Sequence, residues 1–358
     1  MCRKKDEFVK ALLLCGGDGT RLRPFTYTQP KTLLPLGNKP LLFHILESLS
    51  AAAIKKIVII LGRNGSIIEA LLKKENPWGL EVEFLYQPEP LGLAHAVLIA
   101  REALGNSPFL MYLGDNFLDE PLQPLLERFH REKPDSLVLV RRVNNPRNFG
   151  VAVVEGEKVV KVEEKPKVPR SNLALVGVYF FSEEIHQSVQ GIKPSWRGEL
   201  EITDAIQHLI DRGKTVTYQH LSGWWKDTGS AAELLEANKY LLKKIAPLQA
   251  GEVKKSQITG LLELKEGSIL KNCQVKGPVA IGAGCRISGS LLGPYLSIGD
   301  GVEIVNCNLN HSLILPGGEL KNVTLSESIL GERVKVDGAK TRKESCSLLL
   351  GADSIIKI

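Results

Sequence analysis

The sequence contains no apolar run long enough to cross a membrane, and it has few aromatic residues. No segment approaches the ~20 consecutive apolar residues that a transmembrane helix needs. Aromatic residues make up only 6% of the chain, and no cluster of lysines and arginines is interleaved with them. This composition supports neither membrane insertion nor nucleic-acid binding. The formal net charge of +6 suits an anionic small-molecule substrate equally well.

Cysteine pairs with the spacing of a metal or redox motif are also missing. The cysteines are Cys2, Cys15, Cys273, Cys285, Cys307 and Cys346, and none belongs to a Cys-x-x-Cys motif. We interpret them as reduced thiols of a protein in a reducing, cytoplasmic compartment. The apolar run near the amino terminus ends in glycines and is too short for a signal peptide, so we do not expect export.

The 358 residues predict two domains, and the patterns of the two parts differ. From residue 7 to about 245, short apolar runs alternate with segments of helical periodicity. The runs Ile57–Leu61 and Phe109–Leu113 are continuously apolar, which is typical of strands covered on both faces. We therefore predict a Rossmann-like α/β domain over residues 1–245, with a mostly parallel, doubly wound sheet.

The carboxyl-terminal part has almost no helical periodicity. We interpret residues 246–262 as a linker and residues 263–358 as a separate domain. Apolar residues there recur every six positions, with a one-residue slip after the fourth, at Ile269, Val275, Ile281, Ile287, Leu292, Ile298 and Ile304. A six-residue repeat with glycines at corners is typical of a parallel β-helix, and a β-sandwich would not produce it.

A glycine-rich loop follows the first predicted strand, Ala11–Leu14. Gly16, Gly17 and Gly19 occupy three of four positions, and Thr20 and Arg21 follow. Glycines allow backbone amides to converge on one point, which favours binding of anionic oxygens. Ordinary strand-to-helix connections take two to six residues, and this one continues to a predicted helix near Pro40. A phosphate-binding loop and a solvated basic loop are both compatible with the pattern.

Asp115 and Asp227 each begin a glycine-containing turn at the end of an apolar or aromatic run. Two carboxylates that meet over a triphosphate would hold Mg²⁺, which prefers oxygen ligands shared with phosphates. Each aspartate taken alone also fits an ordinary turn or helix cap.

Lys31 and Lys165 stand next to prolines, in Gln29-Pro30-Lys31 and Glu164-Lys165-Pro166. A lysine on a rigid loop is a positioned charge for a phosphate, although a solvated surface lysine has the same sequence context. No Ser/His/Asp or Cys/His nucleophilic set is apparent, and His95 is interpreted as a helix residue. The pattern predicts direct transfer by positioning and electrostatics, without a covalent enzyme intermediate.

The sequence resembles the sugar-1-phosphate nucleotidyltransferases, in particular the long-form glucose-1-phosphate thymidylyltransferases with a left-handed β-helix at the carboxyl end. The resemblance covers nearly the whole chain. It rests on the ordered motifs GGDGTRLRPFT, PKTLLPLGNKP, QPEPLGLAHAV, MYLGDN, FGVAVVE, VEEKPKVPRSNLALVGVYFF, RGELEITDAI and WWKDTG.

The resemblance implies transfer of a nucleotidyl group, with dTTP and glucose 1-phosphate as the expected substrates. It places the triphosphate on Gly16, Gly17, Gly19, Thr20 and Arg21. It places Lys31 beside the leaving pyrophosphate, the base on Gln87 and Gly92, and Mg²⁺ on Asp115 and Asp227. The sugar phosphate would be bound by Gly150, Glu164, Lys165 and Val176. A homo-oligomer that binds neither nucleic acid nor membrane is also implied.

Three residues depart from the family pattern. Cys15 replaces a small residue, Thr32 stands where relatives commonly have glutamine, and Phe149 stands where short-form members have tyrosine. UTP or another nucleoside triphosphate therefore stays open as the donor. A non-catalytic nucleotide-sugar-binding paralogue is a further alternative, although Arg21, Lys165 and both aspartates are present. So is an additional acetyltransferase activity of the β-helix, for which His311 is the only candidate histidine in the repeat.

Overall fold

The structure is a computed structural model that describes residues 9–338 and 344–358. The chain divides into two compact units. One, called here the α/β unit, comprises the residues up to Asp18 together with Leu42–Lys226. The other, called here the β-helix unit, comprises Gly19–Leu41 and Asp227–Ile358. Among the described residues, no helix is long and apolar enough to cross a membrane.

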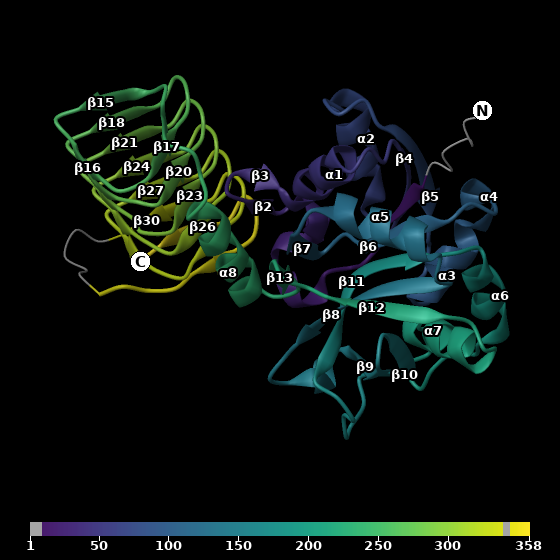
Figure 1. Cartoon of the computed structure of the whole chain (residues 1–358). Helices are drawn as coiled ribbons and strands as arrows, with labels where there is room; N and C mark the ends of the chain where they lie inside the picture. The colour runs from purple at the N-terminus through teal and green to yellow at the C-terminus, as the bar shows by residue number, and fades with distance from the viewer. Residues whose placement is uncertain (1–8, 339–343) are drawn as a thin grey trace. The chain divides into compact units, whose positions relative to one another are not determined.

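A nine-stranded mixed sheet forms the centre of the α/β unit (Figure 1). Its order is β5 (Glu81–Tyr86), β4 (Lys56–Leu61), β1 (Lys10–Cys15), β6 (Phe109–Leu113), β11 (Leu173–Phe181), β8 (Ser136–Arg142), β12 (Val216–His220), β10 (Lys158–Glu164) and β9 (Gly150–Glu155). The first four strands are parallel, whereas β11 runs antiparallel to both of its neighbours β6 and β8. The predicted α/β class is confirmed.

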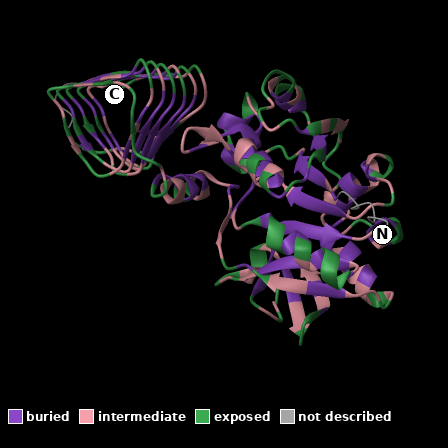
Figure 2. Ribbon diagram, turned by 45° about the horizontal axis from the view of Figure 1, so that its top comes forward, coloured by how far each residue is buried: buried purple, intermediate pink, exposed green. Residues whose placement is uncertain are grey.

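Helices cover both faces of this sheet. They are α1 (Leu41–Ala51), α2 (Gly65–Lys74), α3 (Leu93–Ile99), α4 (Arg101–Leu104), α5 (Leu122–Glu132), α6 (Glu184–Gly191) and α7 (Ile202–Asp211). Leu12 and Met111 share one core with residues of α3, α6 and α7. On the opposite face the ring of Phe129 in α5 packs against Phe180 of β11. Figure 2 shows the strands largely buried and the helices with exposed outer faces. Burial on both faces explains why the strands read as continuous apolar runs.

Polar loops follow three of the parallel strands of the sheet. Gly16 follows β1, Gln87 follows β5, and Gly114 and Asp115 follow β6. Because these strands run in one direction, their carboxyl ends open onto a single edge of the sheet. A two-stranded sheet, β7 (Asn116–Asp119) with β13 (Trp224–Asp227), continues from that edge.

The β-helix unit contains three parallel sheets that successive strands visit in turn. The first holds β14 (Leu248–Gln249), β17 (Leu262–Leu264), β20 (Val279–Ile281), β23 (Leu296–Ile298), β26 (Ser312–Ile314), β29 (Ile329–Leu330) and β31 (Leu349–Leu350). The second holds β15 (Glu252–Lys254), β18 (Ile269–Lys271), β21 (Arg286–Ser288), β24 (Glu303–Val305), β27 (Glu319–Lys321), β30 (Lys335–Asp337) and β32 (Ile355–Lys357). The third holds β16 (Gln257–Thr259), β19 (Gln274–Lys276), β22 (Leu291–Leu292), β25 (Asn308–Leu309) and β28 (Thr324–Leu325). This arrangement is that of a parallel β-helix.

Two details differ from the sequence analysis. In the repeat, Leu270 rather than Ile269 faces the core, because Leu270 pairs with Ile287 in the sheet. The segment 246–262, expected to be a linker, is built into the β-helix. Its strands β14, β15 and β16 pair with β17, β18 and β19, so the first coil begins earlier than the apolar repeat indicates.

The β-helix unit also contains the segment Gly19–Leu41 and helix α8 (Ala231–Leu242). The segment has three short 3₁₀ turns, at Thr20–Leu22, Phe25–Tyr27 and Lys31–Leu33. It ends in a hairpin of β2 (Pro35–Leu36) and β3 (Lys39–Pro40), which leads into α1 at the position predicted for a helix. Most of the long connection after β1 is thus associated with the β-helix rather than with the sheet that it leaves.

Candidate active site

The sheet edge of the α/β unit carries Gly16, Gly17 and Gln87 side by side. A Cβ placed on Gly16 would lie 3.5 Å from Oε1 of Gln87, and the backbone of Gly17 is exposed. Gln87 is held by its own neighbours, since its Nε2 donates to the carbonyl of Gly92 at 3.1 Å and lies 2.9 Å from Nδ1 of His95. His95 lies in α3, as expected, and its ring helps to orient the glutamine.

Position 92 has room and a backbone conformation for glycine only. Its φ is 104°, and a Cβ there would collide with the backbone of Leu200. Leu200 in turn accepts a hydrogen bond from the amide of Ala94 at 3.0 Å. The close approach ties the start of α3 to the segment before α7 and sets the position of Gln87.

Asp115 is held by a chain of side-chain hydrogen bonds. Nδ2 of Asn116, a buried residue, donates to Oδ1 of Asp115 at 3.0 Å. Nε1 of Trp225 donates to Oδ1 of Asn116 at 2.6 Å. Trp225 therefore orients Asn116, and Asn116 orients the carboxylate. Neither residue was singled out from the sequence.

Glu164 and Lys165 form the second polar cluster of this unit. Nζ of Lys165 and Nη1 of Arg197 each lie 3.5 Å from Oε1 of Glu164, and Oγ1 of Thr203 donates to its Oε2 at 3.1 Å. Gly150 pairs with Glu164 across β9 and β10, and a Cβ on Gly150 would lie 2.6 Å from Thr203. The predicted residues Gly150, Glu164 and Lys165 are thus brought together, and Val176 is fully buried in β11.

The carboxylates of this unit influence one another. Burial raises the pKa of Asp204 and of Glu201, and the charge of Glu164 raises both further. Burial also raises the pKa of Tyr179 far above its ordinary value, with smaller contributions from Glu164 and Asp115. Both carboxylates are therefore close enough to Tyr179 for their charges to act on its hydroxyl. Nη2 of Arg197 lies 2.7 Å from Oε1 of Glu199, and its Nη1 lies 3.3 Å from Oε1 of Glu201. The guanidinium therefore compensates part of this negative charge.

The remaining predicted residues belong to the β-helix unit. Gly19 accepts a hydrogen bond from Oγ1 of Thr26 at 2.8 Å, which closes the turn that carries Thr20 and Arg21. Nη2 of Arg21 lies 3.8 Å from Oδ2 of Asp227. Arg21 and Asp227, far apart in the sequence, are therefore neighbours.

Lys31 begins a 3₁₀ turn, and the next residue, Thr32, is fully buried. Within the part of the chain that the structure describes, Oγ1 of Thr32 has no hydrogen-bond partner. Burial of Thr32 fixes the turn that presents Lys31, so this departure from the family pattern lies directly beside a proposed phosphate-binding lysine.

Asp115 and Asp227 each offer carboxylate oxygens, the kind of ligand that a hard divalent cation prefers. No group of three or more His, Cys, Asp or Glu side chains capable of holding a metal is found among residues 9–338 and 344–358. Mg²⁺ is usually bound beside phosphates by one or two protein carboxylates. The oxygen-only chemistry of Asp115 and Asp227 agrees with this requirement.

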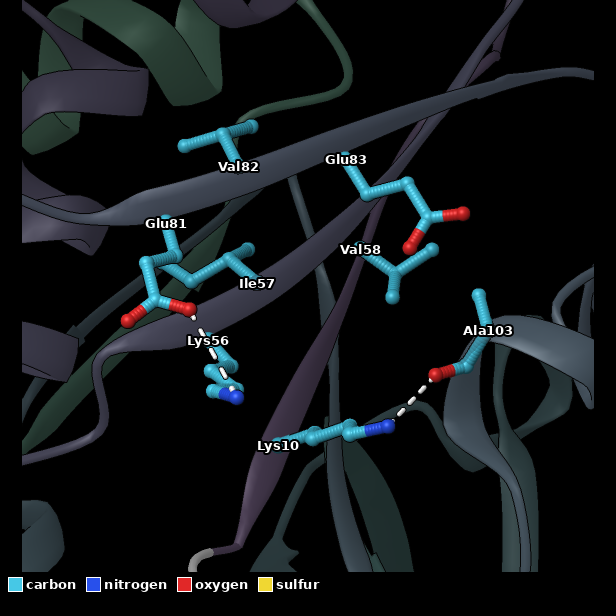
Figure 3. Close-up of a pocket in the computed structure, with 8 residues that line it drawn as sticks. All are labelled: Lys10, Lys56, Ile57, Val58, Glu81, Val82, Glu83 and Ala103. Carbon is cyan, nitrogen blue, oxygen red and sulfur yellow. Dashed lines mark hydrogen bonds and ion pairs between the residues drawn. The ribbon is translucent and has the colours of Figure 1, made fainter.

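A cavity of about 400 Å³ lies elsewhere, at the opposite end of the strands (Figure 3). Its lining includes Lys10, Lys56 and Glu81, the first residues of β1, β4 and β5. Nζ of Lys10 donates to the carbonyl of Ala103 at 2.6 Å, and Nζ of Lys56 lies 3.6 Å from Glu81. Because ligands of such sheets bind beyond the carboxyl ends of the strands, this cavity is not the candidate active site.

His311 was the only candidate for a second chemistry in the β-helix. Its ring packs edge-on against Tyr295 at 6.2 Å, and its Nδ1 lies 3.8 Å from Glu327. Burial and the nearby Lys239 lower the pKa of His311. These contacts are those of a half-buried residue packed against the β-helix.

Comparison with known proteins agrees with the sequence and the fold. The nucleotidyl transferase family model matches residues 10–244. The chain is 42% identical to a glucose-1-phosphate thymidylyltransferase of Streptomyces griseus, over 98% of this chain and 99% of that protein. It is 41% identical to the protein of the same name from Streptomyces antibioticus, over 98% and 99% of the two chains. A crystal structure described as a glucose-1-phosphate thymidylyltransferase of Bacillus anthracis covers 67% of this chain and 98% of its own, with 34% identity and a TM-score of 0.62. The resemblance read from the motifs is confirmed, and the chain belongs to the nucleotidyl transferase family.

Proposed function

We propose that this protein transfers a thymidylyl group from dTTP to glucose 1-phosphate, forming dTDP-glucose and pyrophosphate. The observation that carries the proposal is the cluster of Glu164 and Lys165. A carboxylate suited to sugar hydroxyls is fixed by Thr203 and Arg197 beside a lysine suited to a phosphate. The full-length relatives named as glucose-1-phosphate thymidylyltransferases support the same activity.

The roles assigned to the residues follow the chemistry of their groups. The triphosphate would be bound by Gly16, Gly17, Gly19, Thr20 and Arg21, and the base by Gln87 and Gly92. Lys31 would stabilise the leaving pyrophosphate. Gly150, Glu164, Lys165 and Val176 would bind the sugar phosphate. These roles are supported by the position of the residues on polar loops or in polar clusters, except for Val176, which is buried in β11. Substitution of each residue tests its role.

The reaction needs no protein nucleophile. An oxygen of the sugar phosphate attacks the α-phosphorus of the nucleotide and forms the new P–O bond. The bond from the α-phosphorus to the oxygen that bridges to the β-phosphate breaks, and that oxygen leaves with pyrophosphate. Lys165 would hold the attacking phosphate, Arg21 would stabilise charge at the reacting phosphorus, and Lys31 would stabilise the leaving group.

We propose Asp115 and Asp227 as the protein ligands of a divalent cation, with Mg²⁺ as the physiological ion. Held by these two carboxylates, such a cation would supply positive charge to offset that of the phosphates. Asn116 and Trp225 would keep the Asp115 carboxylate oriented for this purpose. Binding of Mn²⁺ as a paramagnetic probe tests the site without turnover, since Asp115→Asn would weaken binding in the presence of dTTP.

UTP is the alternative donor. Thymine and uracil present the same pairing edge, and the bonds of Gln87 to Gly92 and His95 do not distinguish them. A matrix of nucleoside triphosphates against sugar 1-phosphates, read by pyrophosphate release, tests the assignment. Release with dTTP and glucose 1-phosphate is the expected result. Preference for another pair would change the substrate, and no release with any pair would remove the activity.

We also propose the finer features of the architecture. The chemistry would be carried mainly by residues 1–245, and the β-helix would be left-handed. Coils of this unit place residues with positive φ at equivalent corners, at Asn272, Gly289, Asn306 and Asn322, which suits a tightly wound, short-sided coil. A homo-oligomer is predicted as well. Sedimentation equilibrium would test the oligomeric state, and a single species with the mass of one chain would contradict it.

A further inference from the structure

The outer surface of one β-helix sheet is buried although its side chains point away from the core. In β23, Leu296 and Ile298 belong to the β-helix core, and Ser297 between them faces outward. Its sheet neighbours Ala280 and Leu313 also face outward, and all three are at most 1% exposed. Helix α8 contacts β23 and β26 and covers this surface. The helix and the β-helix therefore pack as one body within their unit.

Asn238 of α8 is the polar centre of this interface. It is 1% exposed, and its Oδ1 accepts two hydrogen bonds of 2.8 Å, one from the amide of Gly37 and one from Oγ of Ser297. A buried amide oxygen with two donors is fully satisfied, and its removal would leave both donors without a partner. Asn238 thereby connects the β-helix to the turn between β2 and β3.

A second bond connects the same turn to the same coil. Asn38, which follows Gly37, donates from Nδ2 to the carbonyl of Ile298 at 2.8 Å. The turn is thus bonded to two adjacent residues of β23, directly through Asn38 and indirectly through Asn238. Two bonds at one turn fix its orientation as well as its position.

The turn between β2 and β3 lies at the carboxyl end of the segment Gly19–Leu41, which carries Arg21 and Lys31. The hairpin begins at Pro35, and the amide of Leu41 donates to the carbonyl of Leu34 at 3.2 Å. Lys31 lies just before this hairpin, and Arg21 lies at the other end of the segment, beside Asp227. The β-helix also contacts the middle of the segment, because a Cβ on Gly351 would lie 3.2 Å from Cβ of Pro24.

We infer that Asn238 is a positioning residue for the segment Gly19–Leu41, and that the β-helix serves through it as the platform that holds Arg21 and Lys31 in place. This inference rests on the proposed function, because it gives those two side chains their roles. Reactions that depend on alignment lose rate when a charged group moves by about 1 Å, so a loosened platform would reduce turnover without the loss of any group that touches substrate.

The test compares three variants in the full-length protein. Asn238→Ala removes the shared acceptor. Asn38→Gly removes the second bond while glycine keeps the positive φ of 62° at that position without strain, so this variant is expected to fold. Ser268→Ala is the matched control. Ser268 is a buried β-helix serine whose hydroxyl donates to the carbonyl of Gly282 and accepts from the amide of Cys285, away from the turn.

The readouts are kcat, the KM of each substrate, the melting temperature and hydrogen exchange of the peptide that spans residues 31–41. We expect Asn238→Ala and Asn38→Gly to lower kcat by about tenfold or more and to raise the KM of dTTP. The KM of glucose 1-phosphate should change less than about twofold, because Glu164 and Lys165 belong to the other unit. Exchange in the 31–41 peptide should accelerate. Ser268→Ala should lower the melting temperature and leave both KM values and kcat unchanged.

The outcomes separate this inference from the proposed function. A wild-type protein that is inactive with every substrate pair overturns the proposed function and the inference with it. An active wild type whose Asn238→Ala and Asn38→Gly variants keep kcat and KM, and lose only thermal stability as Ser268→Ala does, overturns the inference alone. Faster exchange of the 31–41 peptide together with the split in KM supports it.

Discussion

Nη2 of Arg21 lies 3.8 Å from Oδ2 of Asp227, so a side chain of the glycine-rich loop is adjacent to the carboxylate that ends β13. The Arg21 side chain is 66% exposed, and an exposed ion pair of this length contributes at most about 1 kcal/mol to stability. A nucleotide phosphate would therefore compete readily with Asp227 for the guanidinium. We interpret the pair as a resting contact between two groups with separate roles in the reaction.

Replacement of Asp227 by asparagine tests its assignment as a metal ligand. We expect Asp227→Asn to lose most turnover because the site loses a negative charge, and to lower the melting temperature little because the ion pair is weak. The measurements are kcat, the Mg²⁺ concentration for half-maximal rate, and a thermal melt. Asp337→Asn, an exposed position in the β-helix, is the control. Full activity of Asp227→Asn would remove this residue from the proposed site.

Gly229 provides space for the Arg21 guanidinium. A Cβ at Gly229 would collide with Nη2 of Arg21 and lie 2.9 Å from its Cζ. The Cβ would also lie 3.1 Å from Oδ1 of Asp227, which needs only a small shift. Because the main obstacle is the end of a flexible side chain, Gly229→Ala should displace Arg21 at little cost in stability. We expect kcat to fall by about 10²-fold, as for loss of an electrostatic stabiliser. Gly318→Ala in the β-helix is the matched control, because a Cβ there would lie no closer than 3.3 Å to its nearest neighbour. Unchanged kcat in Gly229→Ala would argue against the role of Arg21.

Thr203 is predicted to act through Glu164. Thr203→Val keeps the shape of the buried side chain and removes the hydroxyl that donates to Oε2 of Glu164 at 3.1 Å. Glu164 would then be less well oriented, and the KM of glucose 1-phosphate should rise several-fold with the KM of dTTP unchanged. Thr217→Val, in β12, is the matched buried control. Equal changes in the KM of glucose 1-phosphate and of dTTP would indicate a general perturbation of the fold instead of a defect in sugar binding.

The raised pKa of Asp204 predicts a pH-dependent stability. Burial is the larger cause and the charge of Glu164 the smaller one. The folded protein keeps this proton at pH values where the unfolded chain has lost it, so stability falls as pH rises from the ordinary value of 3.8 through the raised value. Asp204→Asn lacks this proton equilibrium. Its stability relative to wild type, from urea unfolding at several pH values, should therefore increase with pH across that window. A difference that does not change with pH, or that decreases as pH rises, would contradict the assignment.

Burial raises the pKa of the Cys307 thiol to about 11, so little thiolate exists near neutral pH. We expect iodoacetamide to label Cys307 in the native protein at pH 8 far more slowly than in urea. Peptide mass spectrometry measures the labelling at each cysteine. Cys346, which is only partly buried, serves as the internal comparison and should react faster. Native labelling of Cys307 at the rate found in urea would contradict the packing of the β-helix core.

Site residues within local motifs could be identified from the sequence, whereas contacts between distant segments could not. Asp115 was identifiable because it follows an apolar run, and Gln87 because it belongs to a family motif. Both lie at the carboxyl ends of parallel strands, where such sheets bind ligands. Arg197 and Thr203 were not assigned a role, because their contact with Glu164 joins segments more than thirty residues apart. No local pattern encodes such a contact.

The domain boundaries illustrate the same limit. Apolar periodicity marks where a repeat is regular, and the first coil, with β14 to β16, has exposed or half-buried residues that hide it. The association of Gly19–Leu41 with the β-helix rests on single polar residues such as Asn38 and Asn238. An asparagine in a turn or helix has many ordinary explanations, so only the folded structure reveals this connection.

The most direct test of the account is pyrophosphate release from dTTP and glucose 1-phosphate by the purified full-length protein. The account predicts release that depends on both substrates and on Mg²⁺, that EDTA abolishes, and that yields one dTDP-glucose per pyrophosphate. Pyrophosphate release that does not require the sugar phosphate, or no release with any nucleoside triphosphate and sugar 1-phosphate, would contradict it.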